Sequence, residues 1–210
     1  ILPNKLSIFP LSNFIFFPKT SIPLNIFEPR YLQMINDSIK ENRIIGMIQP
    51  KKNSQKLKKP EIYSIGCAGK ITSFNETDDK RIELVLSGVS RFKVIEEINS
   101  EKLYRKCFVD FEIFKKDLLE SDQKIKFQDL EFLFKDLKYF LQKKNYILDW
   151  KELEKQNLDQ VINTLCMISP ISLEEKQMLL ESENLEDRKN KLKKIIKTYT
   201  ISDIQVSTLQ

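Results

Sequence analysis

The first half of the chain alternates hydrophobic and polar residues in short runs that end at prolines or turn residues. Ile82, Leu84 and Leu86, for example, fall on one face of a run, which is the period of a half-buried strand. Residues 77–80, Thr-Asp-Asp-Lys, predict a hairpin turn. The pattern predicts about six strands in a curled, antiparallel, partly closed sheet: residues 6–10, 14–17, 44–49, 71–74, 81–94 with a bend at Gly88, and 107–113.

One helix is expected to interrupt these strands. Pro29 suits the first position of a helix, where its missing N–H costs nothing. The residues that follow at helical spacing and predict its buried face are Tyr31, Met34, Ile35, Ser38 and Ile39.

After residue 115 the hydrophobic period becomes helical, and three or four helices are expected. Ser172 and Glu175 have the spacing of a capping box, and Pro170 stops the helix before them. The stripes that predict the other helices are Phe127, Leu130, Phe134, Leu137 and Leu141; Leu158, Val161, Ile162 and Leu165; and Leu185, Leu192, Ile195, Ile196 and Tyr199. We therefore predict an α+β chain with a β subdomain at 1–115, a helical subdomain at 116–201 and a frayed tail at 202–210.

Composition narrows the class of protein. Among the 210 residues 41% are hydrophobic and 31% are charged, as in soluble globular proteins. No run approaches the roughly 18 apolar residues of a membrane span, so we expect a cytoplasmic protein without a membrane partner.

The net charge of +5 raises the question of nucleic-acid binding. Of the 35 basic residues 29 are Lys and six are Arg, whereas nucleic-acid sites favour the planar fork of Arg. Most of this charge is therefore interpreted as a solvated surface. A lysine-rich loop at residues 51–59 is the candidate electrostatic contact, through Lys51, Lys52, Lys56, Lys58 and Lys59.

The chain has no histidine, which excludes Ser-His-Asp and Cys-His catalysis and every His metal site. Its four glycines cannot form a phosphate-binding loop. Cys67, Cys107 and Cys166 lie far apart and predict small core residues rather than a zinc site. Carboxylate pairs such as Asp78-Asp79 and Glu96-Glu97 are expected to be solvated. We therefore predict no catalytic residue, metal or cofactor.

Three stretches of sequence resemble the LON domain, the N-terminal substrate-recognition domain of the ATP-dependent protease Lon. They are residues 8–31, which contain Phe-Pro and then Pro-Leu-Asn-Ile-Phe-Glu-Pro-Arg-Tyr; residues 65–92, with Gly-Val-Ser-Arg-Phe; and residues 175–188. The positions that carry the resemblance are Pro10, Leu11, Phe17, Pro18, Pro23, Leu24, Phe27, Glu28, Pro29, Arg30, Tyr31, Gly66, Gly88, Arg91, Phe92, Gln177, Leu180 and Glu181. The resemblance implies a PUA-like β subdomain packed with a helical subdomain, as in stand-alone bacterial LON-domain proteins.

Most of these signature positions are interpreted as structural, with ligand contact as the alternative. Phe27 and Tyr31 are expected to anchor the helix in the core, and Glu28 to favour its positive end. Arg30 is expected to pair with a nearby carboxylate or carbonyl. By strand alternation Phe92 points inward and Arg91 outward.

The resemblance implies binding of unfolded or degradation-bound polypeptides, in a groove between sheet and helices, and a partner role in proteolysis. No Ser-Lys arrangement in the chain resembles the protease part of Lon, so we expect a non-catalytic recogniser or adaptor. RNA binding through a PUA-like sheet and the basic loop is the main alternative. A small-molecule pocket is the third.

Overall fold

A computed structural model describes residues 2–54, 59–119 and 130–207. The chain divides into two compact units, unit 1 (residues 1–119) and unit 2 (residues 120–210). The sequence placed this division at residue 115, inside the short 3₁₀ helix η2 (Glu112–Leu118), which belongs to unit 1.

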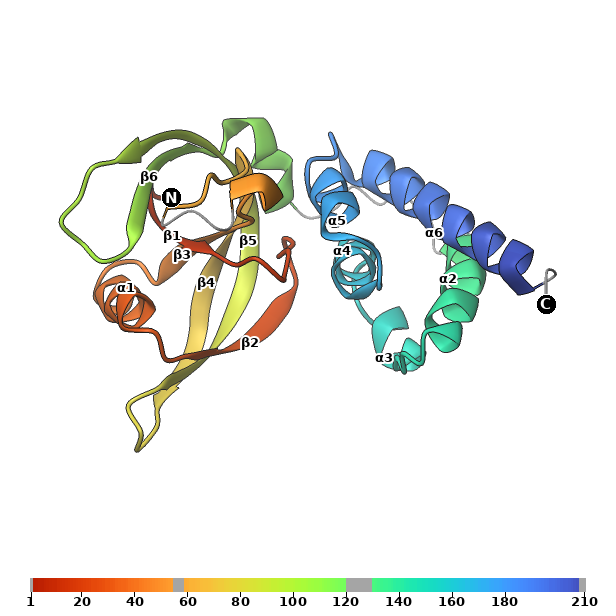
Figure 1. The fold of residues 1–210 in the computed structure, drawn as a ribbon, viewed down its shortest axis with the longest axis horizontal. Helices are drawn as coiled ribbons and strands as arrows, with labels where there is room; N and C mark the ends of the chain where they lie inside the picture. The colour runs from red at the N-terminus through yellow and green to blue at the C-terminus, as the bar shows by residue number, and fades with distance from the viewer. Residues whose placement is uncertain (1, 55–58, 120–129, 208–210) are drawn as a thin grey trace. The chain divides into compact units, whose positions relative to one another are not determined.

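In its described residues unit 1 is a six-stranded sheet with one α-helix (Figure 1). The strands are β1 (Lys5–Pro10), β2 (Ser21–Ile26), β3 (Ile44–Ile48), β4 (Ile65–Glu76), β5 (Ile82–Ile98) and β6 (Arg105–Asp110), and the helix is α1 (Pro29–Lys40). The order is β2-β5-β4-β3-β1-β6, and β6 also pairs with β5. The long β5 therefore closes a ring of five strands with its second half and holds β2 outside the ring with its first half.

The sheet is mixed rather than antiparallel throughout, because β1 and β3 pair in parallel. Parallel neighbours need a crossover connection, and β2 with α1 forms it. Helix α1 begins at Pro29 as predicted and buries Tyr31, Met34, Ile35 and Ser38. The hairpin turn at 77–80 is also confirmed, with Lys80 at a positive φ of 63°.

Two predicted strands differ in the structure. Residues 14–17 form no strand, although Ile15, Phe16 and Phe17 are all buried. Their backbone passes beside β5 so closely that a Cβ on Gly88 would lie 2.2 Å from the Phe17 carbonyl oxygen. Strand β6 ends at Asp110 rather than 113, because the Asp110 carboxylate accepts the Glu112 N–H and turns the chain into η2.

The core of unit 1 is a cluster around Phe92, which is fully buried as predicted. Gly66 leaves room for its ring, since a Cβ there would lie 2.7 Å from Phe92 Cζ and 2.4 Å from the Met47 carbonyl oxygen. The other buried members of the cluster are Leu6, Ile8, Ile48, Ala68, Cys107 and Val109. All three cysteines are buried, as their apolar neighbours predicted, and none forms a disulfide.

Over residues 130–207 unit 2 has five α-helices where three or four were expected (Figure 1). They are α2 (Glu131–Lys143), α3 (Trp150–Glu154), α4 (Leu158–Ile168), α5 (Leu173–Leu180) and α6 (Leu185–Ser207). Helix α6 packs against α2, α4 and α5. It continues through the predicted tail at 202–207, where no Gly or Pro stops it.

The predicted capping box is present, because the Ser172 side chain accepts the Glu175 N–H and Glu175 accepts the Ser172 N–H. Phe127, which was assigned to the stripe of the first helix, lies outside the described residues. Over the part of the chain that the structure describes, no helix is both long enough and apolar enough to cross a membrane.

Candidate functional site

Most signature residues of the first stretch lie around two surface cavities of unit 1, although Phe17, Pro18, Pro23 and Pro29 line neither. The smaller cavity, of about 300 Å³, is lined by residues 9–12 at the end of β1, residues 24–28, and Arg30 and Tyr31. Three consecutive residues of β2 contribute to it. Because side chains alternate between the faces of a strand, this is expected where a cavity meets a strand edge. Among the described residues β2 pairs with β5 alone, so its other edge is open.

The larger cavity, of about 700 Å³, adjoins the smaller one. Pro10, Ser12, Arg30 and Tyr31 line both cavities. The remaining wall of the larger cavity comes from residues 97–105, which join β5 to β6, and from Pro50, Lys59 and Pro60. We call the joined cavities the surface groove: residues 24–28 form one end, residues 97–105 the other, and the four shared residues the middle.

The middle of the surface groove is built on the start of α1. Tyr31 is buried, with its ring 4.2 Å from that of Phe9, and burial raises the pKa of its hydroxyl. The Arg30 guanidinium lies 4.5 Å from the centre of the Tyr31 ring and pairs with Glu28 at 2.8 Å. Arg30 therefore has the carboxylate partner that was predicted, yet its side chain is half exposed and faces the groove.

The far end of the groove is fastened to α1. Lys102 and the Tyr104 hydroxyl both bind one carboxylate oxygen of Asp37, at 3.0 and 2.8 Å. The Leu103 N–H donates to the Gln33 side chain at 3.0 Å. The hydrogen bond from Lys102 lowers the pKa of Asp37, and burial raises the pKa of Tyr104 to about 12. The segment is thus anchored by its polar atoms, which leaves its apolar side chain turned outward.

A charged cluster lies in the same end of the groove. Glu97 accepts two hydrogen bonds from Arg105, at 3.1 and 2.7 Å, and an ion pair from Lys59 at 2.9 Å. Arg105 also donates to the Pro60 carbonyl at 2.6 Å. Burial acts to raise the pKa of Glu97, but the hydrogen bonds from Arg105 and Lys59 outweigh it and lower the pKa. Glu97 is therefore partly buried and paired, not solvated as predicted.

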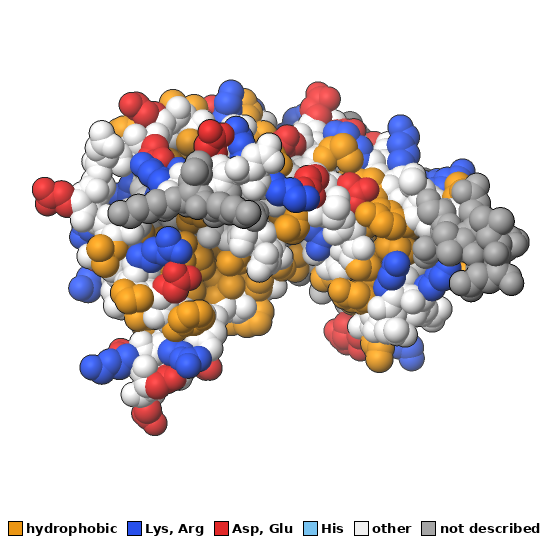
Figure 2. All heavy atoms as spheres, viewed as in Figure 1, with side chains coloured by type: hydrophobic (Ala, Val, Ile, Leu, Met, Phe, Trp, Pro, Cys, Tyr) orange, Lys and Arg blue, Asp and Glu red, His pale blue; other side chains and the backbone are white. Residues whose placement is uncertain are grey.

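Each end of the surface groove carries an exposed hydrophobic side chain. Phe27 and Leu103 are each 63% exposed. The prediction that Phe27 anchors α1 in the core was wrong: the chain turns at Glu28 before the helix begins, and Tyr31 alone takes that role. In Figure 2 hydrophobic side chains gather on the face of unit 1 where Figure 1 draws β2. Among the described residues no cluster of His, Cys, Asp or Glu is suited to hold a metal ion.

The basic loop contributes little of its predicted positive surface to the groove. Lys51 pairs with Glu61 at 3.3 Å, and Lys52 is exposed in the 3₁₀ helix η1 (Lys52–Ser54). Among the described lysines of this loop, only Lys59 lines the groove. Lys56 and Lys58 lie outside the described residues.

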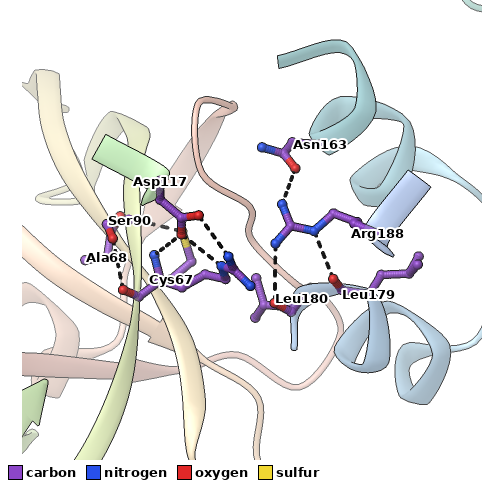
Figure 3. Close-up of polar contacts among 9 residues, drawn as sticks. Cys67, Ala68, Ser90, Asp117, Asn163, Leu179, Leu180 and Arg188 are labelled. Atoms are coloured by element: carbon purple, nitrogen blue, oxygen red, sulfur yellow. Dashed lines mark hydrogen bonds and ion pairs between the residues drawn. The ribbon is translucent and has the colours of Figure 1, made fainter. Parts of the chain in front are cut away.

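A second set of signature residues is buried and has structural partners. Arg91 was predicted to point outward, but it is 2% exposed and binds both carboxylate oxygens of Asp117, at 2.8 and 2.9 Å (Figure 3). The cause is η2, which places Asp117 and the Phe114 ring over this face of β5. Strand alternation alone does not reveal such a cover.

In unit 2, Arg188 is also buried (Figure 3). Its guanidinium donates to the carbonyls of Leu179 and Leu180 and to the Asn163 side chain. Gln177, which is buried, donates to Glu181 at 2.7 Å. These contacts tie α4, α5 and α6 together.

Sequence reasoning missed the wall at residues 97–105. Its members have no shared motif, and they lie beside Arg30 and Tyr31 through the pairing of β5 with β6 and the hydrogen bonds to α1. Asp37, which holds this wall, was not singled out by the sequence. The nearest sequence signal was the Gly-Val-Ser-Arg-Phe motif at residues 88–92, which located strand β5 but not the segment that follows it.

Comparison with known proteins gives the family. The model of the ATP-dependent protease La (LON) substrate-binding domain matches residues 5–198. Lon protease from Desulfosudis oleivorans is 31% identical over 119 residues, which cover 55% of this chain and 15% of that protein. Lon protease from Dictyoglomus thermophilum is 22% identical over 191 residues, 91% of this chain and 24% of that protein. The chain thus matches about a quarter or less of the length of these relatives.

Solved structures agree on the fold. A Lon N-terminal domain protein from Xanthomonas campestris superposes with a TM-score of 0.65 at 20% identity, covering 90% of this chain and 96% of that one. The N-terminal domain of Lon protease from the Mycobacterium avium complex gives 0.66 at 14% identity, covering 92% and 98%. The predicted α+β fold and the LON resemblance are confirmed, and the chain belongs to the LON substrate-binding domain family.

Proposed function

We propose that this chain binds extended, unfolded polypeptides along the surface groove of unit 1 and catalyses no reaction on them. One observation carries the proposal: two cavities that share four lining residues lie beside the open edge of β2, and each is lined by an exposed hydrophobic side chain. The backbone groups of the β2 edge and the exposed hydrophobic side chains can therefore contact the same bound polypeptide.

The open edge of β2 supplies the sequence-independent part of recognition. An unpaired strand edge presents N–H and C=O groups to which an extended peptide adds as a further strand. Most backbone groups of a folded protein are already paired within its own structure, so the edge favours unfolded chains. Pro23 removes one donor from β2, which limits unwanted pairing between copies of the edge.

The two hydrophobic side chains supply the remaining affinity. Phe27 and Leu103 offer apolar contact to a bound chain, and Pro10, Pro50 and Pro60 line the groove between them. Such contacts are tolerant of sequence, because apolar burial has no direction. The expected complex is weak and fits many polypeptides.

The experiment compares one polypeptide in two states. A disulfide protein that is reduced and alkylated stays unfolded, and its native form is the control. Fluorescence anisotropy with the labelled unfolded form is expected to show saturable binding, and the native form is expected to show none. Equal binding of both forms, or binding of neither, contradicts the proposal.

The family description supports a second step, in which the bound polypeptide is delivered to an ATP-dependent protease as by an adaptor. Degradation of the alkylated polypeptide by such a protease from the same cells should accelerate when the chain is added. A Phe27→Ser variant is expected to lose the acceleration. An unchanged rate with the normal chain would reject delivery while leaving polypeptide binding intact.

A further inference from the structure

We propose that the end of the surface groove at Glu97 is a carboxylate subsite, which selects polypeptide segments that carry an acidic group beside an apolar residue. The inference rests on the proposed polypeptide binding and gives it a substrate class. It is carried by the charges that face the larger cavity.

Four cationic side chains line this cavity, and three carboxylates form ion pairs with them. Arg30 is paired with Glu28, and Lys102 with Asp37, so these pairs carry no net charge. Glu97 is shared by two cations, Lys59 and Arg105. The cluster around Glu97 therefore has one more positive than negative charge, and that surplus faces the groove.

The geometry leaves this surplus available to a ligand. Arg105 is held on three sides, by both oxygens of Glu97 and by the Pro60 carbonyl, and its side chain is 17% exposed. Lys59 makes its ion pair at 2.9 Å while 63% of its side chain stays exposed. An incoming carboxylate thus meets a fixed guanidinium and a solvent-facing ammonium without displacing Glu97.

The apolar half of the segment has its own contact nearby. Leu103, 63% exposed, lines the same cavity as Lys59 and Arg105. A segment with a hydrophobic residue close to a carboxylate satisfies both features. That carboxylate comes either from an internal Asp or Glu or from the C-terminus of the bound chain.

The test uses the full chain and three labelled peptides. All share two hydrophobic residues around a central position. One peptide carries Asp there and one carries Asn, both with an amidated C-terminus, and the third carries Asn there with a free C-terminus. At low salt the carboxylate-bearing peptide is expected to bind roughly three- to fivefold more tightly than its neutral match, and salt should reduce the ratio. The Asp–Asn ratio reports an internal carboxylate, and the free–amidated ratio reports a terminal one.

Three variants assign the effect. Lys59→Gln keeps the Arg105–Glu97 pair and should bring the ratio close to one. Glu97→Gln enlarges the surplus charge and should raise the ratio above that of the normal chain. Lys70→Gln, an exposed lysine of β4 that does not line the groove, removes the same charge elsewhere and should leave the ratio unchanged. Thermal unfolding checks that each variant is folded. If Glu97→Gln does not fold, Lys59→Gln alone decides the test, because the Lys59 side chain is largely exposed.

The outcomes separate the two proposals. If all peptides bind equally well and Lys59→Gln changes nothing, the carboxylate subsite is rejected and polypeptide binding stands. If no peptide binds, polypeptide binding itself fails. If a single-stranded RNA displaces the peptides and loses its binding in Lys59→Gln, the cluster is a phosphate site, which also overturns the inference.

Discussion

Arg30 and Arg91 both belong to the sequence signature of the family, yet they occupy opposite environments. Arg30 opens α1, pairs with the neighbouring Glu28 and keeps half of its side chain exposed beside the groove. Arg91 lies in the middle of β5, is 2% exposed and grips Asp117, which lies 26 residues further along the chain. Arg30 lines surface cavities large enough for a ligand, whereas Arg91 joins β5 to η2 inside unit 1.

The difference teaches that a family signature mixes two kinds of position. A buried ion pair marks a structural position, because removing one partner leaves the other charge buried and unpaired. A residue at a surface groove contributes little to folding, so its presence in the signature points to binding. Burial and partners, rather than the motif, distinguish structural positions from binding positions. Variants at buried positions should therefore lose more stability than variants at the groove.

Arg91→Ala should reduce the free energy of unfolding most. It leaves the Asp117 carboxylate buried without its partner, which typically costs about 3–5 kcal/mol. Urea unfolding measures the loss, and hydrogen exchange should locate it in β5 and η2 and not in the helices of unit 2.

The matched control for this prediction removes both charges. The double variant Arg91→Met, Asp117→Leu should recover most of the stability, because no charge is then left unpaired. If the single variant is as stable as the normal chain, the ion pair does not close the fold and the comparison with Arg30 fails.

Gly88→Ala should come next, with a loss of about 1–3 kcal/mol. The new Cβ would lie 2.2 Å from the Phe17 carbonyl oxygen and 3.2 Å from Pro18 Cα, so backbone must move. Thermal unfolding measures the effect. Lys70→Ala, on the neighbouring strand but exposed, is the control and should change the midpoint little.

Asp37→Asn should have a smaller, pH-dependent effect of under about 1 kcal/mol, because the carboxylate is partly exposed. Its pKa is lowered in the folded chain from the ordinary value of 3.8. Its stabilisation is therefore present above that pH and is lost as the pH falls through the folded-state pKa. The difference in melting temperature between the normal chain and the variant should be present at pH 7 and vanish below pH 3.8. A difference that grows on acidification would contradict the assigned role.

Arg30→Ala should change stability least, by under about 0.5 kcal/mol, because the Glu28 pair is exposed. It should nevertheless weaken binding of an unfolded polypeptide, since Arg30 lines both cavities of the groove. Parallel anisotropy and urea measurements on one preparation separate the two effects. A variant that loses stability but keeps its affinity would place Arg30 with Arg91 and remove the division.

Local patterns predicted much of the fold. Pro29 and the spacing of Tyr31, Met34 and Ile35 located α1, and Ser172 with Glu175 located the start of α5. These features depend on neighbours a few residues away. The parallel pairing of β1 with β3, and the non-strand path of residues 14–17 beside Gly88, depend on segments far apart in sequence.

The groove was less predictable than the fold for the same reason. Phe27 was expected in the core because hydrophobicity alone does not say that the chain turns at Glu28. Glu97, Lys59 and Arg105 come from three separate segments, and their cluster exists only once β5 and β6 pair. The family resemblance predicted polypeptide binding in a groove between sheet and helices, but it named no residues that line such a groove.

The most direct test of the central claim is the affinity of the full chain for a labelled, permanently unfolded polypeptide when both ends of the groove lose their hydrophobic side chains. The Phe27→Ser, Leu103→Ser double variant is compared with Ile95→Ser, whose side chain is 60% exposed in unit 1 but lines neither cavity. The account predicts a Kd raised at least about tenfold in the double variant, as expected when two apolar contacts of about 0.7 kcal/mol or more each are lost, and unchanged in the control. Equal affinity of all three proteins would contradict binding in the surface groove.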